Sequence, residues 1–250
     1  MRFPKTDLLR NSILLVGGLL GLSVSFSLLF AQSYQKIPPK INPPDAAFLK
    51  QYDTLAAAYL KSEELEKMYI VIQKGLSLAN KSKNELYQGI FFFHKAYYFK
   101  RKYQTDSGIA YARKAIPIFQ RHKDWKRSSH MMYRLSTFYL DNKDQVSAMK
   151  QLDALLRFNE KYNEHNYTGA AYNLLAFTFR RLRDTLNQKK YILKELEFVE
   201  KQNSNYERVY VYDEWATYLA GQKKFKEAHA YYTKAYTIVQ TQQNDEAKAE

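Results

Sequence analysis

The residues best suited to chemistry are five histidines, and their spacing does not assemble a site. No two of them lie four residues apart, and no HExxH pair occurs, so no metal site is predicted. His94 and His130 fall on neighbouring predicted helices, where we expect surface or rim positions rather than a catalytic pair. The full set is His94, His122, His130, His165 and His229.

Other signatures of catalysis are missing from the sequence. The chain has no Cys, which excludes thiol catalysis, disulfides and Cys-based zinc sites. It contains no GxSxG, P-loop or GxGxxG motif. Asp141–Asp144 (DNKD) resembles part of a calcium loop but lacks the Gly and the terminal Glu, so a turn is the better interpretation. We predict a protein that is not an enzyme and binds no cofactor; the alternative is an enzyme subunit whose site this chain helps to frame.

The chain is strongly basic. Its 39 Lys and Arg against 25 Asp and Glu give a net charge of +14. This surplus fits acidic partners, an anionic surface or simply a well-solvated exterior. Aromatic residues make up 16% of the chain, and a basic, aromatic composition would suit single-stranded nucleic acid. The N-terminus argues against that partner.

Residues 1–33 have the layout of a secretory signal peptide. Three basic residues precede an almost wholly apolar run, Ile13–Phe30, and Ala31-Gln32-Ser33 resembles a cleavage site. The run of 18 residues lies between a signal core, about 7–15 residues, and a spanning helix, roughly 17–25. An uncleaved membrane anchor is therefore the alternative. Either reading predicts export, to a periplasmic or other extracytoplasmic location.

A short linker is predicted next. Residues 34–44 hold four of the six prolines, which lack an amide donor and restrict the residue before them. We therefore expect extended chain there, with Asp45 as the N-cap of a first helix.

Beyond residue 45, one pattern of small and large residues returns about every 40 residues. The small position is occupied five times, by Ala56, Ala96, Ser136, Ala176 and Ala216. Four residues earlier stands a large side chain each time, namely Tyr52, Phe92, Met132, Tyr172 and Tyr212. This recurrence predicts five helical hairpins, each covering its neighbour's apolar face. The expected repeats are residues 45–83, 84–123, 124–163, 164–203 and 204–243, with the array spanning 45–240.

The fifth repeat carries the most specific motif. Trp215-Ala216, Leu219, Phe225, Ala228 and Tyr232 follow the spacing of the tetratricopeptide repeat (TPR) signature, and residues 45–240 resemble that family. Small residues are expected where two helices cross, with Phe225 and Tyr232 filling the space around them. The resemblance implies an all-α fold, a right-handed α-solenoid of five antiparallel helix hairpins. The period is similar to that of the longer TPR-like repeats of bacterial signalling proteins.

Several details depart from the family pattern or mark the ends of helices. Met68 and Gln188 stand where TPR proteins prefer a small residue, so looser packing is expected there. Pro117 lies inside a predicted second helix and should kink or shorten it. Polar residues between the two segments of a hairpin predict the N-caps of the second helices, at Ser62, Asp106, Asn142 and Asp184.

In TPR superhelices, the first helix of each hairpin lines the concave groove, and this geometry selects the candidate binding residues. They mix aromatic, cationic and amide side chains, which suits an extended peptide or a short helix from a protein partner, including an acidic one. The Lys–Asn arrangement with which some TPR proteins hold a C-terminal carboxylate is not reproduced. The predicted groove residues are Phe93, Tyr97, Lys100, His130, Tyr133, Arg134, Thr137, Asn173, Phe177, Arg180, Arg181, Tyr210, Asp213 and Thr217.

The last residues suggest two functional alternatives. Residues 244–250 are polar, and we expect the start of a capping or sixth-repeat helix there, after a break near Thr241–Asp245.

The first hypothesis is a non-enzymatic, exported scaffold that binds a protein or peptide segment in its groove. The alternative is the sensory region of a bacterial signalling receptor, such as a TPR-containing histidine kinase, cut before its output domain.

Overall fold

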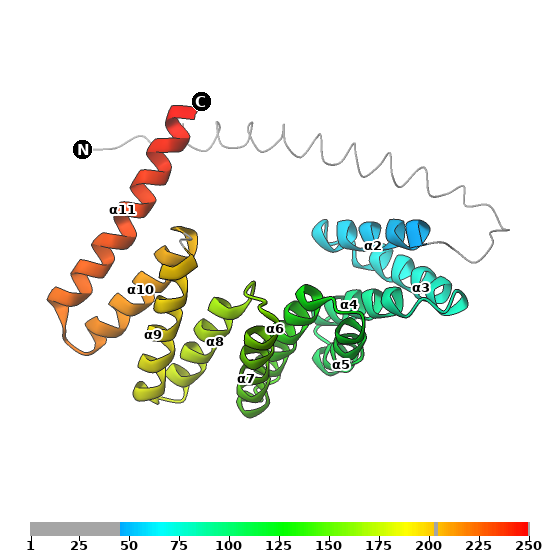
Figure 1. Ribbon diagram of the computed structural model, residues 1–250, viewed down its shortest axis with the longest axis horizontal. Coiled ribbons are helices and arrows are strands. Elements are labelled where there is room, and N and C mark those ends of the chain that lie inside the picture. The colour runs from blue at the N-terminus through cyan, green and yellow to red at the C-terminus, as the bar shows by residue number, and fades with distance from the viewer. Residues whose placement is uncertain (1–45, 203–204, 250) are drawn as a thin grey trace, which may run out of the picture. The chain divides into compact units, whose positions relative to one another are not determined.

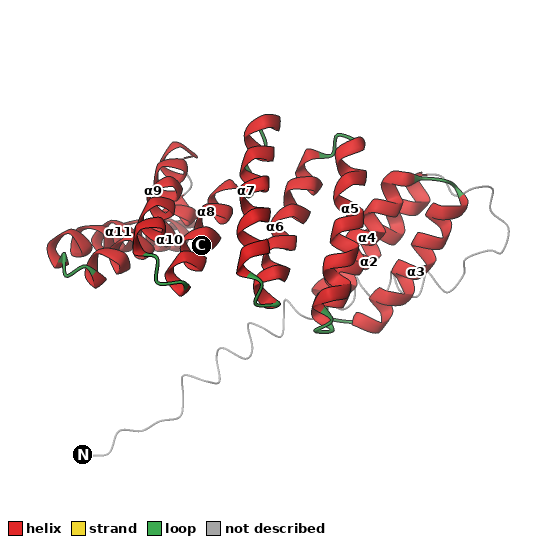
Figure 2. Ribbon diagram, turned by 90° about the horizontal axis from the view of Figure 1, so that it is seen from below, coloured by secondary structure: helices red, strands yellow, loops and turns green. Residues whose placement is uncertain are grey.

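The computed structural model describes residues 46–202 and 205–249, and all regular structure within these ranges is helical (Figures 1 and 2). The predicted signal peptide or anchor and the proline-rich linker lie outside the described residues, as does Asp45. The described part of the chain contains no helix that is both long and apolar enough to cross a membrane. The chain divides into two compact units, residues 1–82 and 83–250, and each is considered by itself.

The helices come in consecutive antiparallel pairs, visible in Figure 1. The first unit contains one pair and the second contains four. In the second unit each helix packs on the next, from α4 to α11. The pairs are α2 (Ala46–Lys61) with α3 (Leu65–Lys81); α4 (Glu85–Arg101) with α5 (Thr105–Arg121); α6 (Trp125–Asp141) with α7 (Gln145–Tyr162); α8 (Thr168–Arg181) with α9 (Thr185–Gln202); and α10 (Asn205–Gly221) with α11 (Phe225–Ala249).

One turn geometry joins these helices throughout the described chain. Non-glycine residues with positive φ, between 53° and 60°, recur at intervals of 20 residues: Glu63, Lys83, Tyr103, Lys123, Lys143, Asn163 and Arg183, and again Lys223. This left-handed conformation is one that glycine adopts without steric cost, so the turns are formed at some expense in backbone strain. In most of these turns the next helix begins two residues after the residue with positive φ.

The position of the turn decides which residue caps each helix. The backbone amides of Tyr87, Arg127, Ser147 and Asn187 donate to the side chains of Asn84, Asp124, Asp144 and Asp184. Each of these caps directly follows the residue with positive φ. The prediction of Asp184 is confirmed, whereas Ser62, Asp106 and Asn142 are wrong. They stand two residues before or after the true N-caps, which are Glu64, Gln104 and Asp144.

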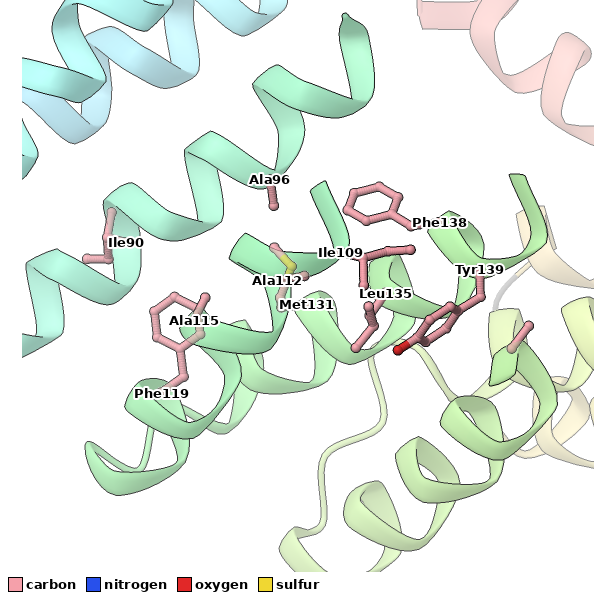
Figure 3. Close-up of a cluster of buried hydrophobic side chains, with 11 residues drawn as sticks. Ile90, Ala96, Ile109, Ala112, Ala115, Phe119, Met131, Leu135, Phe138 and Tyr139 are labelled. Atoms are coloured by element: carbon pink, nitrogen blue, oxygen red, sulfur yellow. The ribbon is translucent and has the colours of Figure 1, made fainter. Parts of the chain in front are cut away.

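The repeating small residue lies in the core of every pair. Ala56, Ala96, Ser136, Ala176 and Ala216 are each 0% exposed. In the second helices Ile72, Ala112, Leu152 and Ile192 are equally buried. Figure 3 shows one part of this core, where Ala96 of α4, Ala112 of α5 and Met131 of α6 lie among larger side chains. The buried side chains of the second unit form three clusters, and each cluster joins helices of successive pairs, as the repeat pattern predicts.

The need for a small residue early in the second helix varies from pair to pair. In α5, a Cβ added to Gly108 would lie 3.2 Å from the carbonyl oxygen of Ala96, so the two backbones approach closely. In α3 and α9 the corresponding Met68 and Gln188 are 0% and 8% exposed. Both larger side chains are therefore enclosed by their surroundings rather than left at an open crossing.

Pro117 does not shorten its helix. The helix α5 continues through Pro117 and has 17 residues, as α4 and α6 do. Ile118 and Phe119, which follow the proline, are buried, and their packing holds this last turn in place. The break expected near Thr241–Asp245 is also absent, because α11 continues to Ala249. This stretch has neither Gly nor Pro, so nothing in its backbone stops the helix.

The last pair differs from the others in the exposure of its second helix. Phe225 is 67% exposed and Tyr232 39%, although both were expected to fill space at the helix crossing. Tyr236, in the same apolar pattern, is 64% exposed. The residues equivalent to Tyr232 in earlier pairs are 0% exposed, and in the described residues no helix follows α11 to cover it. Burial at these positions therefore depends on the neighbouring hairpin and not on the residue type.

Candidate functional site

Side chains of the first helices in the second unit meet one another directly across successive pairs. The Tyr97 hydroxyl on α4 lies 2.7 Å from Nε2 of His130 on α6. Lys100 on α4 forms an ion pair with Asp141 at the end of α6. Asn173 on α8 donates to Glu214 on α10 at 2.7 Å. These contacts bring α4 beside α6 and α8 beside α10, and we call the surface formed by these four first helices the first-helix face.

An aromatic cluster occupies the α4–α6 part of this face and reaches the start of α8. The ring centroids of Phe93 and Tyr97 lie 5.2 Å and 6.0 Å from that of His130. His130 in turn stacks on Tyr167, which directly precedes α8, at 4.8 Å and an interplanar angle of 11°. Tyr133 stacks on the same tyrosine at 5.3 Å. Together with Arg134, these residues form what we call the tyrosine cluster: Phe93, Tyr97, His130, Tyr133, Arg134 and Tyr167.

Every member of the tyrosine cluster is half-buried, neither enclosed in the core nor fully exposed to solvent. The core instead holds residues from the same helices that point the other way, such as Ile90, Met131 and Leu135. Burial raises the pKa of Tyr97 to about 12 and also raises the pKa values of Tyr133 and Tyr167. Their hydroxyls are therefore neutral hydrogen-bond donors over the physiological range.

Arg134 contacts the other members of the tyrosine cluster through two cation–π contacts and one hydrogen bond. Its Cζ lies 5.7 Å from the ring centroids of both Tyr97 and Tyr133, within the range of a cation–π contact. Its Nε donates to Nε2 of His130 at 3.4 Å. Burial and the adjacent guanidinium lower the pKa of His130 to about 4, so the imidazole is neutral at physiological pH.

A polar cluster occupies the α8–α10 part of the face. The Asn173 amide donates to Glu195 Oε2 at 3.3 Å and to Glu214 Oε2 at 2.7 Å, so one side chain holds two carboxylates. Glu195 is 6% exposed. Burial and the charge of Glu214 raise its pKa to about 8. Burial also raises the pKa of Glu214, against the opposing effect of Arg180.

The other predicted groove residues are not members of these two clusters, although Arg180 and Asp213 influence the pKa of Glu214. Arg180 and Arg181 lie over the ring of Phe177, at 5.2 Å and 5.9 Å. The Thr137 hydroxyl donates to the backbone carbonyl of Arg134 within its own helix, at 2.7 Å. On α10, Tyr210 is 57% exposed, Asp213 is exposed, and Thr217 bonds to Tyr232 at 3.1 Å.

His94 was expected at the rim and lies in the core instead. It is 4% exposed, whereas His130 is half-buried on the face. The two rings are therefore not neighbours on one open surface, although both contact Phe93. Phe93 and Tyr97 share one face of α4 because they are four residues apart, and His94 lies around the helix from them.

Three residues of the face escaped prediction: Tyr167, Glu195 and Glu214. Tyr167 is the N-cap residue of α8 and was not among the residues that the groove geometry selects. Glu195 lies on a second helix, which the groove geometry does not select. Its sequence does carry a signal, because Glu195 falls on the buried stripe of α9 with Ile192 and Val199. A carboxylate in such a stripe requires a polar partner, which Asn173 supplies.

The described residues do not contain any group of three His, Asp or Glu side chains able to hold a metal ion. The first-helix face presents ring faces, hydroxyl and amide donors, one guanidinium in the tyrosine cluster and a pair of carboxyl groups. Such groups recognise other molecules through contact and hydrogen bonding.

Comparison with known proteins gives matches at the level of structure. Neither a protein family model nor a curated protein matches the sequence. Among solved structures, BtubC (BKLC) from P. vanneervenii is 13% identical with a TM-score of 0.68, and the match covers 79% of this chain and 82% of the BtubC chain. A kinesin light chain-like protein with TPR-like repeats from P. anserina is 14% identical with a TM-score of 0.63, covering 82% and 99%.

A Rap protein complexed with competence and sporulation factor is also similar, at 11% identity and a TM-score of 0.53, covering 78% of this chain and 53% of its own. At these identities the comparisons establish the fold. The consecutive helix pairs, the buried small residue of each pair and the matched structures lead to one conclusion. The chain is an all-α protein with the fold of TPR-like solenoids.

Proposed function

We propose that this protein is a non-enzymatic scaffold that binds an extended peptide, or a segment of another protein, along the first-helix face of α4, α6, α8 and α10. The observation that carries the proposal is the tyrosine cluster. Six side chains from two first helices and the start of a third are linked by ring and cation–π contacts, and all keep part of their surface open to solvent. Half-buried aromatic rings provide large contact area at low conformational cost.

The arrangement of the face also favours a long ligand over a compact one. The tyrosine cluster at α4–α6 and the polar cluster at α8–α10 lie on successive first helices, and Glu195 is near enough to Tyr133 to influence the pKa of its hydroxyl. A ligand that follows the face meets aromatic rings first and then the half-buried Asn173 amide and Glu214 carboxyl group. The bound factor in the similar Rap protein is consistent with this use of the fold.

We also propose that the protein works outside the cytoplasm. The support is the sequence of residues 1–33, where basic residues precede an apolar run as in a secretory signal peptide or a membrane anchor. The narrower version, in which the chain is the sensory region of a signalling receptor, rests on the same segment and on the resemblance to repeats of bacterial signalling proteins. Fractionation of cells that make the full chain, followed by N-terminal sequencing, tests location and cleavage together.

The binding proposal is tested by displaying a random dodecapeptide library against the full chain in detergent solution. Peptides selected by the wild type should lose at least tenfold in affinity to Tyr133→Ala, because the ring contributes to two contacts of the cluster. Tyr103→Asn is the matched control, since Tyr103 is 94% exposed in a turn outside the cluster and Asn tolerates its positive φ. Failure to select any peptide, or equal loss in both variants, would contradict the proposal.

A further inference from the structure

Arg134 is a half-buried cation of the first-helix face. Two exposed arginines of the same unit form ion pairs, Arg121 with Glu85 at 2.5 Å and Arg157 with Asp153 at 2.6 Å. The half-buried Arg134 forms no ion pair with any acidic residue of the described chain, and its hydrogen-bond acceptor is the neutral His130. A partly desolvated cation that has only neutral neighbours gains from an anion placed beside it.

The guanidinium is also held in position. The rings of Tyr97 and Tyr133 contact it as cation–π partners, and its Nε hydrogen bond fixes the direction of the head group. A side chain that is already ordered loses little entropy when a ligand binds. The Arg134 guanidinium is therefore preorganised to bind an anion.

His130 determines that geometry. Its Nε2 accepts from Arg134 and lies 2.7 Å from the Tyr97 hydroxyl, so the same nitrogen faces two donors. That nitrogen must carry the lone pair, which places the ring proton on Nδ1 and makes the Tyr97 hydroxyl the donor. The imidazole consequently positions the guanidinium without neutralising it or repelling it.

We propose that Arg134 is the anchor for a carboxylate of the bound peptide, with His130 as its positioning residue. The inference rests on the proposed function and specifies the ligand. A carboxylate matches one guanidinium in charge and can accept its parallel N–H groups. A phosphoryl group, with a charge near −2, would call for a further cation, and the nearby Lys100 is already paired with Asp141. The carboxylate comes either from an acidic side chain or from the C-terminus of the peptide.

Peptides selected from the random dodecapeptide library on the full chain supply the probes. Each is synthesised in three forms: unaltered, with Asp and Glu replaced by Asn and Gln, and with an amidated C-terminus. The form that loses affinity identifies the source of the carboxylate. Arg134→Gln should weaken the unaltered peptide about 10–100-fold, as for a hydrogen bond to a charged group, and should leave the neutralised form unchanged.

Arg113→Gln is the matched control. Arg113 also contacts a tyrosine, donating to the Tyr139 hydroxyl at 2.6 Å and 3.0 Å, but it lies on the second helix α5. It should leave the affinity of the unaltered peptide as in the wild type. His130→Ala should weaken binding of that peptide, and His130→Gln should restore it, because the glutamine oxygen can still accept from Arg134.

The outcomes separate the two proposals. If wild type selects peptides whose affinity changes neither with Arg134→Gln nor with loss of their carboxylates, the anchor is refuted while the scaffold remains. If wild type selects no peptide, both are refuted. Equal losses in Arg134→Gln and Arg113→Gln would also overturn the anchor, because general loss of an arginine–tyrosine contact would then explain the effect.

Discussion

Replacing Glu195 by Gln should stabilise the α8–α10 region, and more so as the pH rises. Glu195 is 6% exposed, and its Oε2 shares the Asn173 amide with Glu214. Burial and the charge of Glu214 raise the pKa of Glu195 to about 8, from an ordinary value of 4.5. The buried carboxyl is thus mostly protonated at neutral pH in the folded protein and ionised in the unfolded chain.

The sign and size of the effect follow from proton linkage. Between about pH 4.5 and 8 the folded state binds more protons at this group than the unfolded state does, so the free energy of unfolding falls as the pH rises through that window. Each pH unit corresponds to about 1.4 kcal/mol, which gives a penalty of roughly 3 kcal/mol at pH 7 and roughly 5 kcal/mol at pH 8 and above. Gln carries no charge and can still pair with Asn173, so Glu195→Gln should remove most of this penalty.

The measurement is urea unfolding of the full chain, followed by circular dichroism, at about pH 5, 7 and 9. The control is Glu197→Gln on the same helix, an exposed residue whose pKa is lowered by its hydrogen bond with Lys201. The stability contribution of Glu197 is present above its ordinary pKa and is lost as the pH falls, so this control should not gain stability at alkaline pH. A gain for Glu195→Gln that is the same at pH 5 and pH 9, or a loss at every pH, would refute the reasoning.

Four other substitutions test the packing and the turns by thermal or urea unfolding. Gly89→Ala places a Cβ 2.7 Å from Cγ2 of Ile118 and should lower the free energy of unfolding by about 1 kcal/mol, since overpacking outweighs the gain in helix propensity. Gly221→Ala, with no atom within 4 Å of the added Cβ, should instead raise the free energy of unfolding by up to about 1 kcal/mol. Lys143→Gly, at φ 59°, should gain about 0.5–1 kcal/mol by relieving the left-handed conformation, and a loss would contradict the assigned turn. Ser136→Leu, at a position 0% exposed, should cost about 1–3 kcal/mol, and a neutral result would contradict the close helix crossing.

The helical repeat could be predicted from the sequence because its information is local and repeated. Ala96 and Ala176 identify helix crossings by their size and spacing alone, and each copy of the pattern supports the others. The positions of the turns were harder to predict from the sequence. Residues such as Lys143 and Arg183 carry no glycine signal, yet they adopt positive φ and thereby set the position of the next N-cap. Three of four predicted caps in the second helices were wrong for that reason.

The sequence by itself determined the elements: helices of about 17 residues, their pairing and the buried small residue at each crossing. Only the tertiary structure decided how side chains meet across helices about 40 residues apart. Tyr167 joins His130 because the chain enters α8 beside α6, and Glu195 meets Glu214 because α9 and α10 pack together. The physical reason is that periodicity records which side of a helix is apolar, whereas the charge and burial of a surface group depend on what its neighbours place beside it.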